Sequence, residues 1–260
     1  MQEKHPMEIN RYRYFIKLSY LGTGFHGWQI QSASPTIQQT LEEALSLLLK
    51  EEVRLTGAGR TDTGVHARVF YAHFTSTLPP DAVKNHQLVY KLNRLLPPGI
   101  AVHEIFPVAE NAHARFHATS RTYQYYICTK KDPFWHQRAW LYERRLNINA
   151  MQEAAGILKE HDDFSSFARS NTQVKTNICH VQKANWESDG HILCFTIQAD
   201  RFLRNMVRAI TGTMVDIGLE KVTTEGFDHI IRQKDRRCAG YSAPAWGLYL
   251  TDIRYPYPVL

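Results

Sequence analysis

The sequence predicts an α+β protein made of two ferredoxin-like halves, each a split β-α-β arrangement. In each half, segments in which apolar and polar residues alternate are mixed with segments of helical periodicity. The chain has 260 residues, of which 43% are hydrophobic and 22% charged, as in a globular protein with a real core. No low-complexity linker separates the halves. We place their junction near 108–115 and therefore expect an N-terminal half at 1–110 and a C-terminal half at 111–260.

The first half shows three strand patterns and two helix patterns. We expect strands at 12–20, 67–76 and 101–106. One helix is expected within 34–49, where Thr36 and Gln39 resemble a capping box. A second is expected at 81–96, because Pro97, Pro98 and Gly99 follow it and end it.

The second half repeats this style without repeating the sequence. Strands are expected at 122–129, 178–187, 192–199 and 247–255, with Asp189-Gly190 as the turn between the second and the third. Helices are expected at 148–161, from about Arg201 and from about Thr224. The strands and helices again alternate in the split manner that defines the predicted fold class.

The charge of the chain favours an anionic partner. The net charge is +6, and aromatic residues make up 12% of the sequence, a combination that suits nucleic acid. A basic enzyme without a polyanion partner is the alternative. The four cysteines form no C-x-x-C pair, and neither an apolar signal core nor a run of about 20 apolar residues is seen. We therefore expect a cytoplasmic protein with unpaired thiols and no membrane association.

The segment GAGRTDTGVHAR at 57–68 carries the strongest chemical signal. It lacks the Lys-Ser/Thr of a phosphate loop and the third glycine of a dinucleotide fingerprint. It offers one carboxylate, Asp62, which is too few for a hard cation, and HARFH at 113–117 lacks the Glu of a zinc helix. No metal is therefore expected. Two readings stay open: a structural turn, or a reactive aspartate beside Arg60.

Two further segments carry candidate binding groups. Arg201, Arg204 and Arg208 fall at helical spacings of three and four and would form one basic face. Such a face is either solvated or paired with phosphates or carboxylates. In RTYQYY, Tyr123 and Tyr125 lie on one face of the expected strand, either in the core or stacked on a base.

These segments resemble a known family. GTGFHGWQ, AGRTDTGVHA, HARFHATSRTYQY, FLRNMVRAITG and GLYL occur in this order over nearly the whole chain. Together they resemble the tRNA pseudouridine synthase A family, from which the chain departs slightly at Thr63, where alanine is common. The resemblance implies two α+β halves that form one extended antiparallel sheet flanked by helices, with a basic central cleft. It also implies a homodimer that holds tRNA by its anticodon stem-loop and elbow and isomerises uridines at positions 38, 39 and 40 without metal or cofactor.

The resemblance also assigns roles to residues of this chain. Asp62 matches the catalytic nucleophile, and Arg60 matches the arginine that occupies the space of the flipped target nucleotide. Tyr123 matches the tyrosine that packs on the target uracil and is a candidate for removing its C5 proton. Arg204 matches the partner of the catalytic aspartate, and we expect Arg208 to contact the tRNA backbone.

Two other functions remain as alternatives at this point. A non-catalytic RNA-binding protein would bind tRNA without chemistry, but no RNP1 aromatic block is present. A metal-dependent phosphotransferase or nuclease would need further carboxylates beside Asp62 and would lose activity with a chelator.

Overall fold

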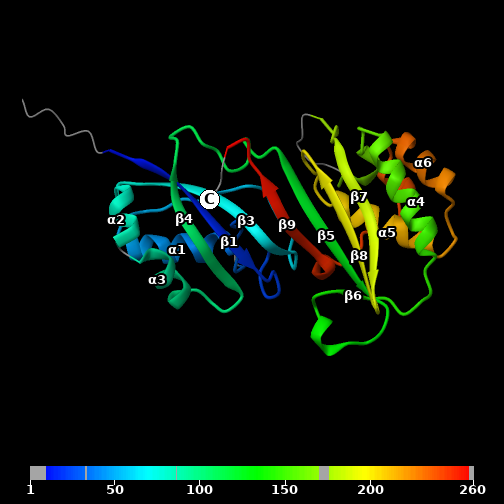
Figure 1. Ribbon diagram of the computed structural model, residues 1–260, viewed down its shortest axis with the longest axis horizontal. Helices are drawn as coiled ribbons and strands as arrows, with labels where there is room; N and C mark the ends of the chain where they lie inside the picture. Colours follow the sequence, from blue (N-terminus) through cyan, green and yellow to red (C-terminus); the bar gives the residue numbers. More distant parts are fainter. Residues whose placement is uncertain (1–9, 33, 86, 170–175, 258–260) are drawn as a thin grey trace, which may run out of the picture.

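The computed structural model describes residues 10–32, 34–85, 87–169 and 176–257. One mixed sheet runs through this part of the chain, with helices packed against it (Figure 1). The α+β class predicted from the sequence is therefore confirmed.

Nine strands form this sheet in the described residues. Its long path runs in the order β4 (Ile100–Val108), β1 (Tyr12–Tyr20), β3 (His66–Ser76), β9 (Leu248–Arg254), β5 (Ser120–Cys128), β8 (Ile192–Ala199) and β7 (Val181–Asp189). Two short strands extend it, β2 (Thr56–Gly57) beside β3 and β6 (Trp140–Leu141) beside β5.

Most strand pairs are antiparallel, as the resemblance implies, but two are parallel. β6 runs parallel to β5, and β9 runs parallel to β3 through the pairs His66↔Tyr249 and Ala67↔Leu250. This second pairing joins the two ends of the sheet, since β9 is antiparallel to β5 on its other side. The centre of the sheet is therefore made by the last described strand.

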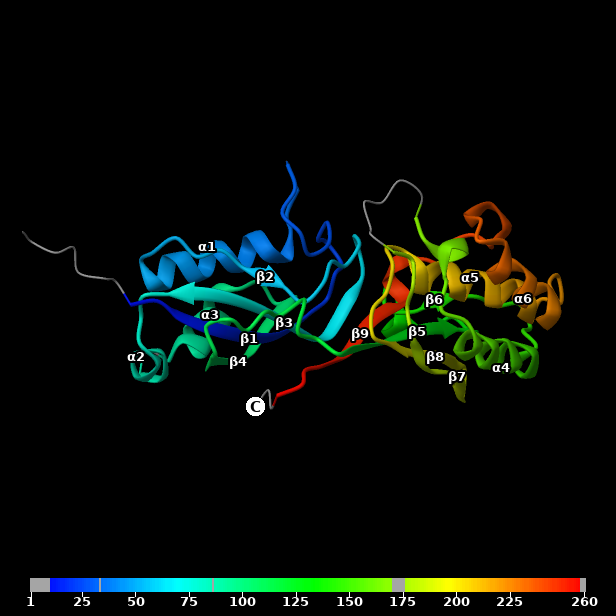
Figure 2. The same ribbon diagram turned by 90° about the horizontal axis from the view of Figure 1, so that it is seen from above.

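Six α-helices accompany the described strands: α1 (Ile37–Leu49), α2 (Pro80–Asn85), α3 (Leu88–Leu95), α4 (Ile148–Ile157), α5 (Met206–Gly218) and α6 (Thr224–Gln233). α1 and α5 lie on the same side of the sheet, over its two ends (Figure 2). α1 starts where the sequence predicts, because the Thr36 hydroxyl accepts a hydrogen bond from the backbone N–H of Gln39. None of the described helices is long and apolar enough to cross a membrane.

Two predicted helices differ from the observed ones. The helix expected at 81–96 is interrupted between α2 and α3, where Gln87 adopts a left-handed conformation with φ of 48°. The helix expected from about Arg201 begins only at Met206, because Asn205 is left-handed with φ of 70° and cannot continue a helix. The prediction that Arg201, Arg204 and Arg208 share a helical face is therefore wrong, since only Arg208 lies on α5.

Two large hydrophobic clusters form the core, one under each end of the sheet. The first packs α1 and α3 against β1 and β3, and the second packs α4, α5 and α6 against β5, β7 and β8. β9 belongs to both, with Leu250 and Ile253 in the first cluster and Leu248 in the second. The division at residue 110 stays a prediction.

Candidate active site

The loop 58–65 connects β2 to β3 and packs on the loop 21–28 that follows β1. The backbone N–H of Trp28 donates to the carbonyl of Thr61 over 3.2 Å. Gly27 has φ of +82°, and a side chain there would collide with that same carbonyl. The glycine-rich segments GTGFHGWQ and AGRTDTGVHA thus pack against each other. The first of them helps to fix the backbone of the second at Thr61, next to Asp62.

Asp62 lies on this loop and faces two arginines of the C-terminal half. Arg208 Nη1 donates a hydrogen bond to Asp62 Oδ2 over 3.2 Å, and Arg204 Nε lies 3.7 Å from Oδ1. The Asp62 side chain keeps 27% of its surface exposed, against 21% for Arg208 and 56% for Arg204. The carboxylate is therefore held between two positive charges while solvent or a ligand can still reach it.

Arg208 is the better fixed of the two arginines. Its Nε donates to the carbonyl of Ala243 over 2.7 Å, which orients the guanidinium toward Asp62. The resemblance implied Arg204 as the partner of Asp62 and charge alone suggested Arg208 as a phosphate contact. The structure brings both to the aspartate, with Arg208 closer.

Tyr123 lies on β5 beside this ion pair and is half-buried. Its ring meets the Phe202 ring edge-on at a centroid distance of 5.1 Å. Burial raises the pKa of Tyr123 to about 12, with the Arg121 charge opposing the shift and the Asp62 carboxylate adding to it. Its hydroxyl is thus a neutral O–H at neutral pH, within the electrostatic reach of Asp62.

Arg60 is one of the exposed residues among the predicted site residues. It lies two residues before Asp62, and its side chain is exposed. Among the described residues it makes no hydrogen bond or ion pair. Its five N–H donors are available to a ligand.

Comparisons with known proteins identify the family of the chain. A family model described as tRNA pseudouridine synthase matches residues 154–256. A tRNA pseudouridine synthase A from Parabacteroides distasonis is 53% identical over 94% of this chain and 96% of its own length. The chain belongs to the tRNA pseudouridine synthase A family. Proteins of the same name from Bacteroides thetaiotaomicron and Bacillus subtilis are 49% and 37% identical, over 94% and 92% of this chain and 91% and 97% of their own lengths.

The family assignment makes the chain an enzyme, an isomerase of the pseudouridine synthase class. The resemblance seen in the sequence is thereby confirmed. Within the described residues, no group of three or more His, Cys, Asp or Glu side chains is arranged to hold a metal ion.

In this pseudouridine synthase, Arg121 is a residue of the site that the sequence analysis did not single out. Its guanidinium donates to the carbonyls of Ala58 and Asp200 over 3.2 and 2.8 Å. It also donates to the carbonyls of Arg115 and Ala118 over 2.7 and 3.1 Å. Ala58 opens the loop of Asp62, and Asp200 precedes the segment of Arg204. Arg121 therefore ties together the two segments that meet at the ion pair.

His66 and Tyr20 also support the loop without having been predicted. His66 is fully buried, and its Nδ1 accepts from the N–H of Gly22 over 2.9 Å. This fixes the proton on Nε2, which lies 3.0 Å from the carbonyl of Trp246. The Tyr20 hydroxyl is 2.9 Å from the Thr61 hydroxyl, next to Asp62. The signal for His66 was its place in GVHA, but single histidines carry little information in a chain that has 13 of them.

Proposed function

We propose that this enzyme isomerises uridine to pseudouridine at positions 38, 39 and 40 of the tRNA anticodon stem-loop, with Asp62 as the catalytic nucleophile. The arrangement of Asp62 carries the proposal. Its carboxylate is partly exposed on a glycine-rich loop and lies 3.2 and 3.7 Å from two guanidinium groups. The three tRNA positions rest on the family resemblance.

The reaction requires the target base to leave the RNA stem. Flipping a paired nucleotide out of a helix costs a few kcal/mol, which contacts to the extruded base offset. Arg60, exposed and without a hydrogen-bonding partner among the described residues, suits the space that the target vacates. The half-buried ring of Tyr123 suits the flipped uracil.

Asp62 then acts on the flipped nucleotide. It attacks the base or the sugar, or removes a ribose proton, and the C1′–N1 bond breaks. The uracil turns in the site, C5 bonds to C1′, C5 loses its proton and N1 gains one. The bond that Asp62 formed breaks again, or the ribose proton returns, so that the free carboxylate is restored. The product has the same atoms and electrons as the substrate, so no oxidant or reductant enters the balance.

Tyr123 and the two arginines have supporting roles in this scheme. Because the pKa of Tyr123 is raised to about 12, its phenol is protonated in the resting enzyme. Removal of the C5 proton by Tyr123 therefore needs an acceptor for the phenol's own proton. Arg204 and Arg208 hold the carboxylate in place and balance its charge.

Assembly and location also belong to the proposal. A homodimer would hold one tRNA through the anticodon stem-loop and the elbow, across a basic central cleft, in the cytoplasm. The net charge of +6 supports a polyanionic substrate. The dimer rests on the family resemblance, and the cytoplasmic location rests on the four cysteines, which form no C-x-x-C pair and suit a reducing compartment.

Tritium release from tRNA labelled at uracil C5 tests the nucleophile. We expect Asp62→Asn to slow release on the order of 10³-fold or more, as loss of a catalytic group does, while tRNA binding is kept. Asp189→Asn, at the exposed β7–β8 turn, is the matched control and should retain full activity. Release by Asp62→Asn at the wild-type rate refutes the assignment, and tRNA binding without release by the wild type favours the non-catalytic alternative.

A further inference from the structure

A groove of about 530 Å³ opens on the face of the sheet opposite Asp62. Side chains alternate across a strand, so Tyr123 and Tyr125 face the helices while Tyr126 faces the other way. Tyr249 pairs with Gln124 and shares that second face, as does Arg68, whose guanidinium carbon lies 5.7 Å from the Tyr126 ring centre and 5.6 Å from that of Tyr249. The groove is therefore separate from the active site.

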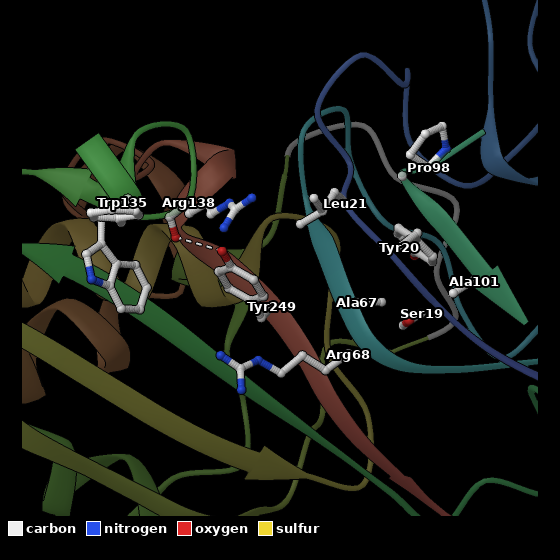
Figure 3. Close-up of a pocket in the computed structure, with 12 residues that line it drawn as sticks. Ser19, Tyr20, Leu21, Ala67, Arg68, Pro98, Ala101, Trp135, Arg138 and Tyr249 are labelled. Carbon is white, nitrogen blue, oxygen red and sulfur yellow. Dashed lines mark hydrogen bonds between the residues drawn. The ribbon is translucent and has the colours of Figure 1, made fainter. Parts of the chain in front are cut away.

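Its two walls come from different parts of the chain (Figure 3). One wall is the segment after β5, with Phe134, Trp135 and Arg138, and the other is the end of β1 with Pro98, Gly99 and Ala101. Arg68 and Tyr249 lie between them, and the Tyr249 hydroxyl donates to the carbonyl of Arg138 over 2.9 Å. A volume of this size is typical of sites for small ligands or single nucleotides.

The groove presents positive charge, and its described lining holds no acidic side chain to balance it. Neither Asp nor Glu is among its lining residues. Arg68 and Arg138 are both exposed, and neither guanidinium makes a hydrogen bond or ion pair with the described part of the chain. Their planar N–H groups suit a phosphate oxygen pair.

Aromatic rings accompany these charges. Phe134 is 82% exposed, the largest value among the exposed large hydrophobic residues of the described chain. Trp135 is anchored on Tyr126 at a centroid distance of 5.3 Å and stays partly open to the groove. An exposed ring beside unpaired arginines suits a stacked base and its phosphate.

We infer that this groove binds an unpaired nucleotide of the tRNA, at a point other than the target uridine. The inference rests on the proposed function for the identity of the RNA. An acidic peptide would satisfy the arginines but would leave the exposed ring without a stacking partner. The groove is also linked to the loop of Asp62, because His66 follows that loop and its Nε2 lies 3.2 Å from the carbonyl of Gln137, next to Arg138 of the groove wall.

The inference is tested by measuring tRNA binding over a range of salt concentrations. We expect Arg68→Gln/Arg138→Gln to weaken tRNA binding at least tenfold and to lower the slope of log affinity against log salt by about 2, for two lost phosphate contacts. Phe134→Ala should weaken binding at least about fivefold with no change of slope. The single-turnover rate at saturating enzyme should stay at the wild-type value in all these variants.

A control with the same loss of charge is Arg94→Gln/Lys159→Gln, two exposed residues outside the groove. If the groove variants bind tRNA like this control, the inference is wrong. It is also overturned if weaker binding comes with a change in oligomeric state by light scattering, which would make the groove a contact between protein chains. A different result would refute the proposed function. In that case no pseudouridine forms, although tRNA binding still depends on the groove residues.

Discussion

Two pairs of arginines lie on opposite faces of the sheet, and they differ in what they contact. Arg204 and Arg208 approach the Asp62 carboxylate at 3.7 and 3.2 Å. Arg68 lies over the rings of Tyr126 and Tyr249, Arg138 is exposed, and no acid is among the residues that line their groove. The first pair holds a group of the protein, and the second is free to hold a group of a ligand.

This difference shows why charge alone does not assign a role. The spacing of arginines along 201–208 suggested a basic face for phosphates, but a left-handed residue places two of the three before the helix. For Arg204 and Arg208, the distance to Asp62 is more informative than their spacing in the sequence. The two arginines of the groove could not be paired by their spacing, since Arg68 and Arg138 are far apart in the sequence.

Among the substitutions that test this comparison, Arg208→Ala has the largest expected effect. It removes the hydrogen bond to Asp62 and the link to Ala243, so we expect turnover to fall about 10²–10³-fold, as when a fixed electrostatic partner is lost. Affinity for tRNA should change much less. Arg204→Ala is the internal comparison, and its more exposed and more distant guanidinium predicts a smaller loss, about tenfold. Equal losses would show that the two arginines are not distinguished by their distances.

Tyr123→Phe is expected to have the next largest effect on turnover. The ring and its contact with Phe202 are kept, so tRNA affinity should be unchanged while turnover falls about 10–100-fold if the hydroxyl takes part in proton transfer. Single-turnover kinetics with a separate binding assay measures both. Unchanged turnover would limit Tyr123 to packing.

The smallest effect concerns His66, which lies on β3 and packs against Tyr249. Burial lowers the pKa of His66, and the Arg138 charge acts in the same direction. A lowered folded-state pKa means that the unfolded chain binds the proton more tightly, so stability is lost as pH falls below about 6.5. Burial also lowers the pKa of His73 to about 4, so the free energy of unfolding should fall by about 1–3 kcal/mol from pH 7 to pH 5.

Urea unfolding at the two pH values measures this loss. His66→Gln should be less stable at pH 7 and lose less on acidification. His103→Gln, in which an exposed hydrogen bond to Ser19 is removed, should keep the wild-type difference. A His66→Gln variant with the full wild-type loss would contradict the assignment.

Much of the fold could be predicted from local patterns. The alternation at 12–20 coincides with β1, and the Thr36 cap with the start of α1, because both depend on neighbours in sequence. The left-handed residue Gln87 could not be predicted, since glutamine rarely adopts this conformation, and Asn205 carries only the weak left-handed preference of asparagine. The parallel pairing of β3 with β9 joins residues 66 and 249, and no local pattern carries such a contact.

The residues of the candidate site also fall into two groups, those that the sequence could predict and those that it could not. Asp62 and Tyr123 stand in recognisable motifs, so the sequence pointed to them. The support from Arg121, Tyr20 and His66 depends on backbone carbonyls and loops that become neighbours only in the folded chain.

The central place of β9 has a consequence for biosynthesis. Its residues leave the ribosome after those of all the other described strands, yet it lies between β3 and β5. Until it is made, β3 and β5 lack their common neighbour, and the segments of Asp62 and Arg208 have no sheet to hold them together. Each new molecule is thus kept from an assembled active site until β9 is translated and inserted.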